Sequence, residues 1–473
     1  MMRKLLKTLG IIVAVILLIL IALVQRIDRT PYTETRHYAE WEAWIDQTTF
    51  SINLADSLLI GWGKTNIVPD FSAPMSGYGN RWGKHFEDVR DSLYVRALSL
   101  QFSEETLTFL AADLLIIPPN VTLRLGELLK SDGISLDEIH LGATHTHHGV
   151  GGWGQKLLGR LFAGKYDERI ERLLAEQMHA AILKSRESFL PAAAKYIELE
   201  FEEGIRNRLP IDPPKVKDPE VRSLVFKRAD GSRAVVLTYG AHSTTLNRKM
   251  LSLSRDFPGH TVDALEADDQ VDFALYFAGA VGSMGFVSEG DTPEERSRHL
   301  GEELARRYLN HTDSMRKMDG SKNLPLNPAK NTPLSPIRFM SEWIPVPLPP
   351  ATLRINLNYA LRPWVFNALF GGSPGDIKVS LIGRTLLLGM PADFSGEIMV
   401  ELDAYARSQG LDLIITSFNG NYMGYITHDR HYVKNMYETV TMSWNGYGAG
   451  DYYTKVAEDI IYKMSQTLSK TNE

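Results

Sequence analysis

The hydrophobic positions of this chain repeat with two different periods. Short runs rich in β-branched and aromatic residues, bounded by turn residues, are typical of strands. The predicted strands are 93–102, 106–111, 138–143, 195–200, 234–239, 273–277 and 379–388. An apolar stripe at helical spacing covers 166–186 and predicts an amphipathic helix there. The same spacing predicts further helices over 293–309, 396–408 and 449–468.

Predicted strands and helices alternate along the chain without internal repeats. Such alternation indicates an α/β fold in which mixed sheets are layered with helices. The chain has 473 residues, enough for a substantial core. We expect one large catalytic domain over residues 29–473.

The first 28 residues differ from the rest of the chain. Arg3, Lys4 and Lys7 precede an apolar run from Leu9 to Val24, and a basic flank before an apolar run is typical of an export signal. The run is slightly shorter than the ~20 residues that span a bilayer comfortably, and it has no clear small-x-small cleavage site. We therefore predict an uncleaved signal anchor over 1–28, with its basic end in the cytoplasm and the remaining chain periplasmic or extracellular. Secretion after signal cleavage is the alternative.

A second segment, 321–375, is rich in proline and lacks periodicity over much of its length. A long irregular stretch in a compact domain is usually a functional loop or a linker. One interpretation is a lid or insertion that presents apolar side chains to an apolar substrate, namely Trp343, Trp364, Phe366 and Phe370. The other is a buried connection without a role in binding.

Composition excludes several classes of function. The net charge is −6 and there is no basic tract, which argues against a nucleic-acid partner. The chain has no cysteine, so disulfides, thiolate metal sites and thiol nucleophiles are all excluded. Any metal must be held by His, Asp, Glu, Tyr or backbone oxygen.

The most informative stretch is 141–152, which places His145, His147 and His148 within four positions, before a glycine-rich turn. Alternate side chains of an extended segment share a face, so His145 and His147 can point into one site. Imidazole is the commonest protein metal ligand and the commonest acid–base group near neutral pH. The alternative is a cluster of surface histidines. The glycines at 149–154 match G-x-G-x-x-G but lack a surrounding βαβ unit, which argues against dinucleotide binding.

Other polar residues follow predicted strands. His242 lies three residues after strand 234–239, where it is either functional or a hydrogen-bonded structural histidine. Asp393 lies at a strand-to-helix junction, where it is either functional or a helix cap. Ser283 lies in a turn of small residues without the G-x-S-x-G pattern of a lipase-type nucleophile. Tyrosines crowd the region after an apolar run at 411–416: Tyr422, Tyr425, Tyr432 and Tyr437.

Taken in order, these segments resemble the neutral (non-lysosomal) ceramidase family from about residue 54 to about residue 468. The matching stretches are GWGKTNI (61–67), MSGYG (75–79), DSLYVRA (91–97), AADL (111–114), THTH (144–147) and SRDFPG (254–259). The family's ceramide-cleaving members carry a further C-terminal β-rich module, so the resemblance concerns the N-terminal catalytic domain alone.

The resemblance implies a set of zinc ligands. They fall on His145, His242, Asp393 and Tyr425. The third position is a glutamate in the ceramide-cleaving members, and the aspartate here is one methylene shorter. Aspartate still ligates zinc at about 2.0–2.2 Å where the backbone lies closer.

The resemblance also implies catalytic residues. These are Ser283, as nucleophile or orienting group, His147 and Tyr437 as donors to a developing oxyanion, and Arg208 as a ligand of the substrate head group. The sequence around Ser283 departs from the family pattern, because Ala-Val-Gly-Ser-Met replaces Gly-Asp-x-Ser-Pro.

The expected activity is therefore that of a zinc-dependent hydrolase that cleaves the amide bond of ceramide-like N-acyl (sphingo)lipids by metal-activated water. Its expected partners are the lipid substrate and, through the anchor, a membrane. One alternative is a zinc hydrolase of a different amide or ester, from the cell envelope or soluble. Another is a catalytically silent, membrane-tethered binding protein. Nothing in the sequence indicates an oligomeric state.

Overall fold

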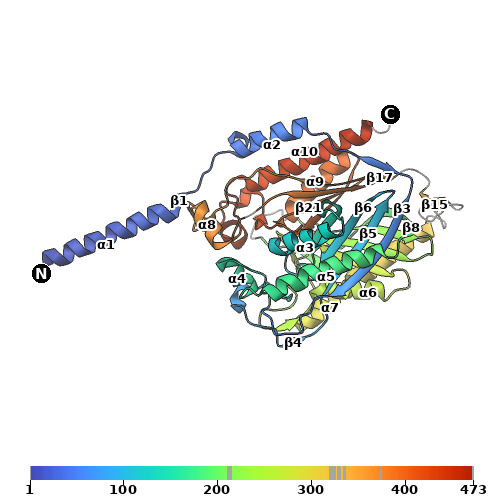
Figure 1. The fold of residues 1–473 in the computed structure, drawn as a ribbon, viewed down its shortest axis with the longest axis horizontal. Coiled ribbons are helices and arrows are strands. Elements are labelled where there is room, and N and C mark those ends of the chain that lie inside the picture. Colours follow the sequence, from blue (N-terminus) through green and yellow to red (C-terminus); the bar gives the residue numbers. More distant parts are fainter. Residues whose placement is uncertain are drawn as a thin grey trace.

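The computed structural model describes residues 2–209, 216–318, 326–327, 332–333, 337–372 and 374–470. It confirms the predicted mixed α/β class: two large sheets lie face to face, helices cover their outer faces, and α1 (Met2–Leu23) extends away from the body (Figure 1).

The first sheet has eight strands in the order β13-β11-β10-β8-β3-β5-β6-β7. Their bounds are Phe273–Ala278, Arg233–Tyr239, Glu220–Arg228, Leu190–Glu200, Leu58–Asn66, Tyr94–Phe102, Glu105–Ala112 and Ile139–Ala143. Neighbours are antiparallel except for the pairs β6–β7 and β11–β13, which are parallel. The helices on its outer face are α3 (Pro119–Ser131), α5 (Glu168–Arg186), α6 (Asp256–Glu266) and α7 (Pro293–Met318).

The second sheet has five strands in the order β2-β17-β20-β21-β23. Their bounds are Asn53–Ala55, Ile337–Ile344, Ile377–Ile382, Thr385–Met390 and Asp412–Ser417. Only β21 and β23 among these pair in parallel. Its outer face is covered by α2 (Arg36–Gln47), α9 (Gly396–Ser408) and α10 (Ala449–Lys470).

Strand alternation explains the layers. In β23, Ile414 packs between the sheets, whereas Leu413 and Ile415 pack against the outer helices. Because successive side chains point to opposite faces, a nearly continuous apolar run fills two core layers at once. The inner layer also holds Phe102 and Phe339, whose rings stack with centroids 4.4 Å apart across the two sheets.

Smaller elements complete the described part of the fold. A three-stranded sheet joins β1 (Val24–Arg26), β19 (Tyr359–Leu361) and β18 (Leu353–Arg354). The short helices nearby are α4 (Leu157–Ala163) and α8 (Pro363–Leu369). Two-stranded pairs are β4 (Asp88–Val89) with β12 (Ser252–Leu253), β9 (Ile205–Asn207) with β14 (Met284–Phe286), β15 (Leu326–Asn327) with β16 (Thr332–Pro333), and β22 (Asp393–Phe394) with β24 (Tyr425–Ile426).

The predicted helices correspond to α5, α7, α9 and α10. The prediction of a single strand over 379–388 was wrong, because this run forms the hairpin of β20 and β21, in which Ile382 pairs with Thr385. Gly383 takes a left-handed φ of 65° in the two-residue turn, a conformation that such turns require. The turn was hidden because the apolar run continues on both sides.

The segment 321–375 also differs from its prediction. Ile337–Ile344 forms a regular strand, β17, so the irregular backbone is confined to other parts of this range, some of which lie outside the described residues. Trp343 belongs to β17, and only Phe370 of the four expected side chains lines the cavity described below. A role as a lid stays a prediction, as does the boundary of the catalytic domain.

The N-terminal helix α1 is long and apolar enough to cross a membrane, and none of its residues is buried. A signal sequence meets the same criterion. The helix therefore fits a signal or an anchor.

Candidate metal site and adjoining cavity

The predicted site residues follow the carboxyl ends of strands in both sheets. His145 comes two residues after β7, His242 three residues after β11, and Asp393 three residues after β21. Strands β7 and β11 run in opposite directions within the first sheet, so their carboxyl ends do not share an edge as those of parallel strands do. The edge strands β13 and β7 nevertheless contact each other, which brings the loops after β7 and β11 together.

A strained backbone shapes the histidine loop. The prediction of an extended segment was wrong at His145, which takes a left-handed φ of 61°. Phe418, which follows β23, has a φ of 67°, and its ring stacks on the His145 imidazole with centroids 4.3 Å apart. Left-handed backbone at bulky residues is uncommon and clusters at functional sites.

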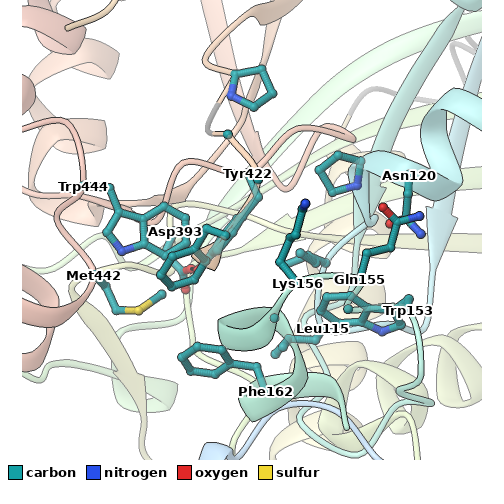
Figure 2. Close-up of a pocket in the computed structure, with 18 of the residues that line it drawn as sticks. Leu115, Asn120, Trp153, Gln155, Lys156, Phe162, Asp393, Tyr422, Met442 and Trp444 are labelled. Atoms are coloured by element: carbon teal, nitrogen blue, oxygen red, sulfur yellow. Dashed lines mark hydrogen bonds between the residues drawn. The ribbon is translucent and has the colours of Figure 1, made fainter. Parts of the chain in front are cut away.

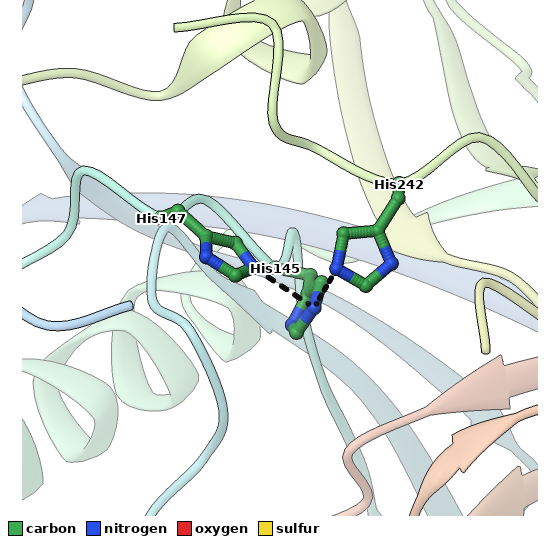
Figure 3. A group of neighbouring side chains, drawn as sticks. All are labelled: His145, His147 and His242. Carbon is green, nitrogen blue, oxygen red and sulfur yellow. Dashed lines mark hydrogen bonds between the residues drawn. The ribbon is translucent and has the colours of Figure 1, made fainter. Parts of the chain in front are cut away.

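Three imidazoles converge on one point (Figure 3). The Nε2 atom of His145 lies 3.0 Å from that of His242 and 3.3 Å from that of His147. The expectation that His145 and His147 point into one site is thus confirmed. His148 is buried but points elsewhere, and its Nδ1 lies 3.0 Å from the carbonyl of Ser252.

Hydrogen bonds from the Nδ1 atoms of His145 and His242 determine the protonation of the Nε2 atoms, which face the centre of the cluster. Nδ1 of His145 lies 2.7 Å from the Leu115 carbonyl, and Nδ1 of His242 lies 3.2 Å from the Val281 carbonyl. A carbonyl can only accept, so each Nδ1 carries the proton in the neutral ring and each Nε2 presents a lone pair. Two such lone pairs 3.0 Å apart are the arrangement that a shared cation satisfies.

Asp393 approaches the same point from the second sheet. Its Oδ1 lies 3.3 Å from His145 Nε2 and has no hydrogen-bond partner among the described residues, although it is buried. Its Oδ2 accepts a hydrogen bond of 2.8 Å from the Tyr422 hydroxyl. Tyr425 is the direct neighbour of Asp393 in the β22–β24 pair. All four predicted zinc ligands therefore lie in one region, with His147.

Burial favours the neutral forms of two imidazoles in the cluster. It lowers the pKa of the His147 and His242 imidazoles well below their usual value, and the neighbouring histidines and Arg208 act in the same direction. Neutral imidazole is the form that binds metals. The group of His145, His147 and His242 could hold a metal ion, and the unpartnered Asp393 oxygen completes a donor set of nitrogen and oxygen atoms that suits zinc.

A cavity of about 400 Å³ opens onto this cluster. Figure 2 shows Trp444, Met442 and Asp393 on one side and Trp153 and Gln155 on the other. Its apolar lining consists mainly of Leu115, Ile116, Leu123, Trp153, Phe162, Phe370, Met442 and Trp444, and its polar lining includes Asn120, Gln155, Lys156, His145, His147, Asp393, Tyr422, Tyr425 and Tyr437. Apolar walls with few convergent polar groups are typical of ligand pockets.

Two predicted catalytic residues lie around Tyr425. The ring of Tyr437 meets that of Tyr425 edge to face, with centroids 5.9 Å apart, and Tyr437 lines the cavity. Arg208 donates from Nη2 to the Tyr425 hydroxyl at 3.2 Å and to the Gly282 carbonyl at 3.0 Å. Glu438 lies 3.3 Å from the same guanidinium. Arg208 thus lies behind Tyr425, outside the set of residues that line the cavity.

Ser283 is not brought into the cavity. Its hydroxyl is fully buried, accepts a hydrogen bond of 3.0 Å from Ser395 and lies 3.4 Å from the Glu397 amide at the start of α9. Beside it, Gly282 lets backbone approach closely, since a Cβ there would lie 2.4 Å from the Asp393 carbonyl. The Ser283 turn therefore supports the backbone that carries Asp393.

Sequence reasoning missed three contributors. Tyr422 was noted only as part of a tyrosine-rich region, yet it holds Asp393. Gly77 has a φ of 110°, and a Cβ there would lie 2.6 Å from the His147 Cα. Arg81 donates to the carbonyls of His147 and Ser76 from beneath the histidine loop. The MSGYG stretch is the signal that marks Gly77.

Residues 58–297, just over half of the chain, match the family model for the N-terminal part of neutral/alkaline non-lysosomal ceramidases. The chain belongs to this family. Membership of this family supports the interpretation of the protein as a hydrolase. Among curated proteins, none matches the chain significantly.

Solved structures agree with the family. The chain is similar to neutral ceramidase from Pseudomonas aeruginosa, with a TM-score of 0.70 and 17% identity over 88% of this chain and 75% of that one. It is also similar to a ceramidase complexed with C2, with a TM-score of 0.69 and 17% identity over 89% and 76%. At this identity the likeness establishes the ceramidase fold.

Proposed function

We propose that this ceramidase-family protein is a zinc-dependent hydrolase that cleaves the amide bond of ceramide-like N-acyl lipids. The observation that supports it best is the apolar cavity that opens onto the histidine cluster and Asp393. A polar, metal-competent group at the end of an apolar cavity suits a substrate with one polar bond and a long hydrocarbon chain.

His145, His242, Asp393 and Tyr425 would hold the zinc. When bound, zinc would lower the pKa of a water molecule and polarise the substrate carbonyl. Arg208 donates to the Tyr425 hydroxyl, and a cation there stabilises negative charge on that oxygen and so favours Tyr425 as a ligand. This assignment replaces head-group binding as the role we propose for Arg208.

His147 is less buried than the other two histidines and lines the cavity, so we assign it to the substrate. Its Nε2 and the Tyr437 hydroxyl would donate hydrogen bonds to the oxyanion that develops at the amide carbonyl. The aromatic walls exclude water from the acyl chain, and Tyr422 holds Asp393 in place.

We also propose that α1 is an uncleaved membrane anchor. Its basic residues Arg3, Lys4 and Lys7 lie at the end remote from the body. By the positive-inside rule this end stays in the cytoplasm, so the catalytic body lies outside it. The substrate would then be a lipid of that membrane.

Hydrolysis of fluorescent N-acyl sphingosines of increasing chain length tests the function. Each methylene buried in the cavity contributes about 0.8 kcal/mol, so kcat/KM should rise up to about fourfold per methylene until the cavity is filled. A chelator should abolish cleavage, as should His145→Ala or His242→Ala. His299→Ala, at an exposed histidine on α7, is the matched control and should retain activity. Chain-length-independent cleavage, or none with zinc bound, would exclude the lipid amidase.

A second candidate is a hydrolase of a different acyl amide or ester. It is favoured by Lys156, which lines the cavity beside Gln155 and makes no ion pair within the described parts of the chain. Its ammonium suits an anionic group on the substrate. Zinc-dependent cleavage of an anionic acyl substrate in preference to N-acyl sphingosine would support this candidate.

A further inference from the structure

The membrane-competent helix is joined to the body without a linker. Strand β1 begins at the residue after α1 ends, and it pairs with β19 in the register Val24–Leu361, Gln25–Ala360 and Arg26–Tyr359. The pairing is continued by the amide of Ile27, which donates to the Asn358 carbonyl at 2.9 Å. The end of α1 is therefore part of a sheet that belongs to the body.

Arg362 completes this junction. Its backbone amide donates to the Leu23 carbonyl at 2.8 Å, and its Nε donates to the Ile21 carbonyl at 3.2 Å. The last carbonyls of a helix have no partner within the helix, and a cation near them is favourable. Arg362 thus caps the C-terminus of α1 and restrains its direction relative to the body.

The same residue leads into the cavity wall. Helix α8 begins directly after Arg362, and Phe370 directly after α8 lines the cavity. Seven helical residues span about 10 Å at the usual rise per residue. The point where α1 would leave a membrane and the cavity wall are therefore separated by only about this distance.

Exposed apolar side chains surround this part of the cavity. Trp364 on α8, Leu157 on α4 and Leu123 on α3 are 57%, 60% and 72% exposed. In Figure 1, α8 and α4 lie at the end of the body from which α1 departs. The basic residues Lys156 and Arg160 are exposed next to Leu157. An apolar patch edged by cations is typical of a surface that rests on lipid.

The length of the apolar run in α1 determines how close this surface lies to the bilayer. The helical part of the apolar run, from Leu9 to Leu23, is about 23 Å long, whereas a bilayer core is about 30 Å thick. A span that is too short draws its flanking residues toward the bilayer. The β1–β19 junction and α8 would then lie in the interfacial layer.

We infer that the α1–β1 junction holds the mouth of the cavity on the surface of the bilayer that contains α1, with Trp364 and Leu157 in the interfacial layer. This inference rests on the proposed function of α1 as an anchor. The cavity then receives its lipid from that same bilayer, and the acyl chain moves from hydrocarbon into the apolar cavity without crossing water. The partner of this surface is the lipid surface itself.

Single-cysteine labelling tests the position of this surface, because the chain has no cysteine of its own. Trp364→Cys and Leu157→Cys, labelled with an environment-sensitive fluorophore, are reconstituted as full chains in phosphatidylcholine vesicles with and without spin-labelled lipid. Leu54→Cys, 55% exposed on β2 beside β17 at the other end of the body, is the control. Strong quenching at 364 and 157 and none at 54 is the expected result. Equal quenching at all three positions would overturn the inference.

A flexible insert between Leu23 and Val24 tests the role of the junction. An insert of about ten Gly/Ser residues releases the body from α1 and should weaken quenching at 364. Turnover of a bilayer-resident N-acyl lipid should fall about tenfold through lost effective concentration, while turnover of a short, water-soluble analogue stays unchanged. The same insert after Gly231, in an open hairpin turn, is the control. If the insert after Leu23 changes neither the quenching at 364 nor the turnover of the bilayer lipid, the proposed role of the junction is wrong. If the native chain shows the expected quenching but turns over neither substrate, only the proposed hydrolase function is wrong.

Discussion

At the scale of single residues, the site depends on backbone conformations that a sequence pattern does not reveal. Alternation along an extended segment predicted that His145 and His147 share a site, and they do, although the backbone at His145 is not extended. The left-handed turn at His145 was not predictable, because non-glycine residues rarely adopt it. Phe418, which also has a left-handed backbone, stacks on the His145 imidazole. Its local sequence does not indicate this contact.

Gly77→Ala tests the close approach beneath His147. A Cβ at Gly77 would meet the His147 Cα at 2.6 Å and would also require a φ of 110°. A displaced His147 backbone would also move the ligand His145, two residues earlier in the same loop, so we expect zinc affinity to fall about 10- to 100-fold, as for other supports of metal ligands, measured by competition with a chelator. Gly133→Ala is the matched control, since Gly133 also has a positive φ but open space around it. Equal zinc affinity in both variants would contradict the steric account.

Tyr422→Phe tests the support of Asp393. The change removes the hydrogen bond to Oδ2 and leaves both carboxylate oxygens without a protein donor among the described residues. Zinc affinity should again fall about 10- to 100-fold, with the fold retained. Tyr462→Phe, at an exposed tyrosine on α10, should leave affinity unchanged. Unaltered zinc binding in Tyr422→Phe would show that Asp393 needs no such support.

At the scale of elements, the start of α9 connects the second sheet to the site. Ser395 is its N-cap and accepts from the Glu397 amide, as a helix preceded by serine predicts. Asp393 therefore does not cap α9 itself, which leaves its carboxylate available for the cluster. The role of Ser283 could not be deduced from sequence, because its partners lie more than a hundred residues away.

Ser283→Ala separates a supporting role from a nucleophilic one. Loss of the buried hydroxyl contact should reduce the free energy of unfolding by about 1 kcal/mol, with kcat lowered less than about tenfold. Loss of a covalent nucleophile costs several orders of magnitude more. Thermal unfolding and steady-state kinetics on N-acyl sphingosine measure the two effects. A fall in kcat of about 10⁴-fold would contradict the supporting role.

At the scale of the whole molecule, the alternation of strands and helices was enough to predict the α/β class. The packing of two sheets against each other was not predictable, because in an apolar run such as 379–388 the sequence does not show which side chains face the other sheet and which face the outer helices. The sheet-to-sheet layer also contains polar groups: His140 on β7 lies 3.0 Å from the Ser380 hydroxyl and 2.9 Å from that of Thr416. Burial lowers the pKa of His140 to about 3, so it is neutral across the physiological range.

Lys378→Met tests how this layer depends on pH. Burial lowers the pKa of Lys378 to about 7, partly offset by the acidic groups of Asp137 and Glu342. The unfolded chain therefore binds more protons than the folded protein between about pH 7 and pH 10.5, and this residue makes stability rise with pH across that window. At pH 7, Lys378→Met should be more stable than the native chain. This gain in the free energy of unfolding should be about 1–3 kcal/mol larger at pH 7 than at pH 10. Denaturant unfolding curves of both proteins at pH 7 and pH 10 measure this gain. A stability difference between the two proteins that does not change with pH would refute the lowered pKa of Lys378.

The central claim is that His145, His242, Asp393 and Tyr425 form a zinc site, and the metal content of the purified full-length chain tests it most directly. Elemental analysis after dialysis against a weak chelator should find one zinc per chain in the native protein. His242→Ala should lose it, and His299→Ala should retain it. Absence of stoichiometric metal from the native chain, or full retention in His242→Ala, would contradict the account.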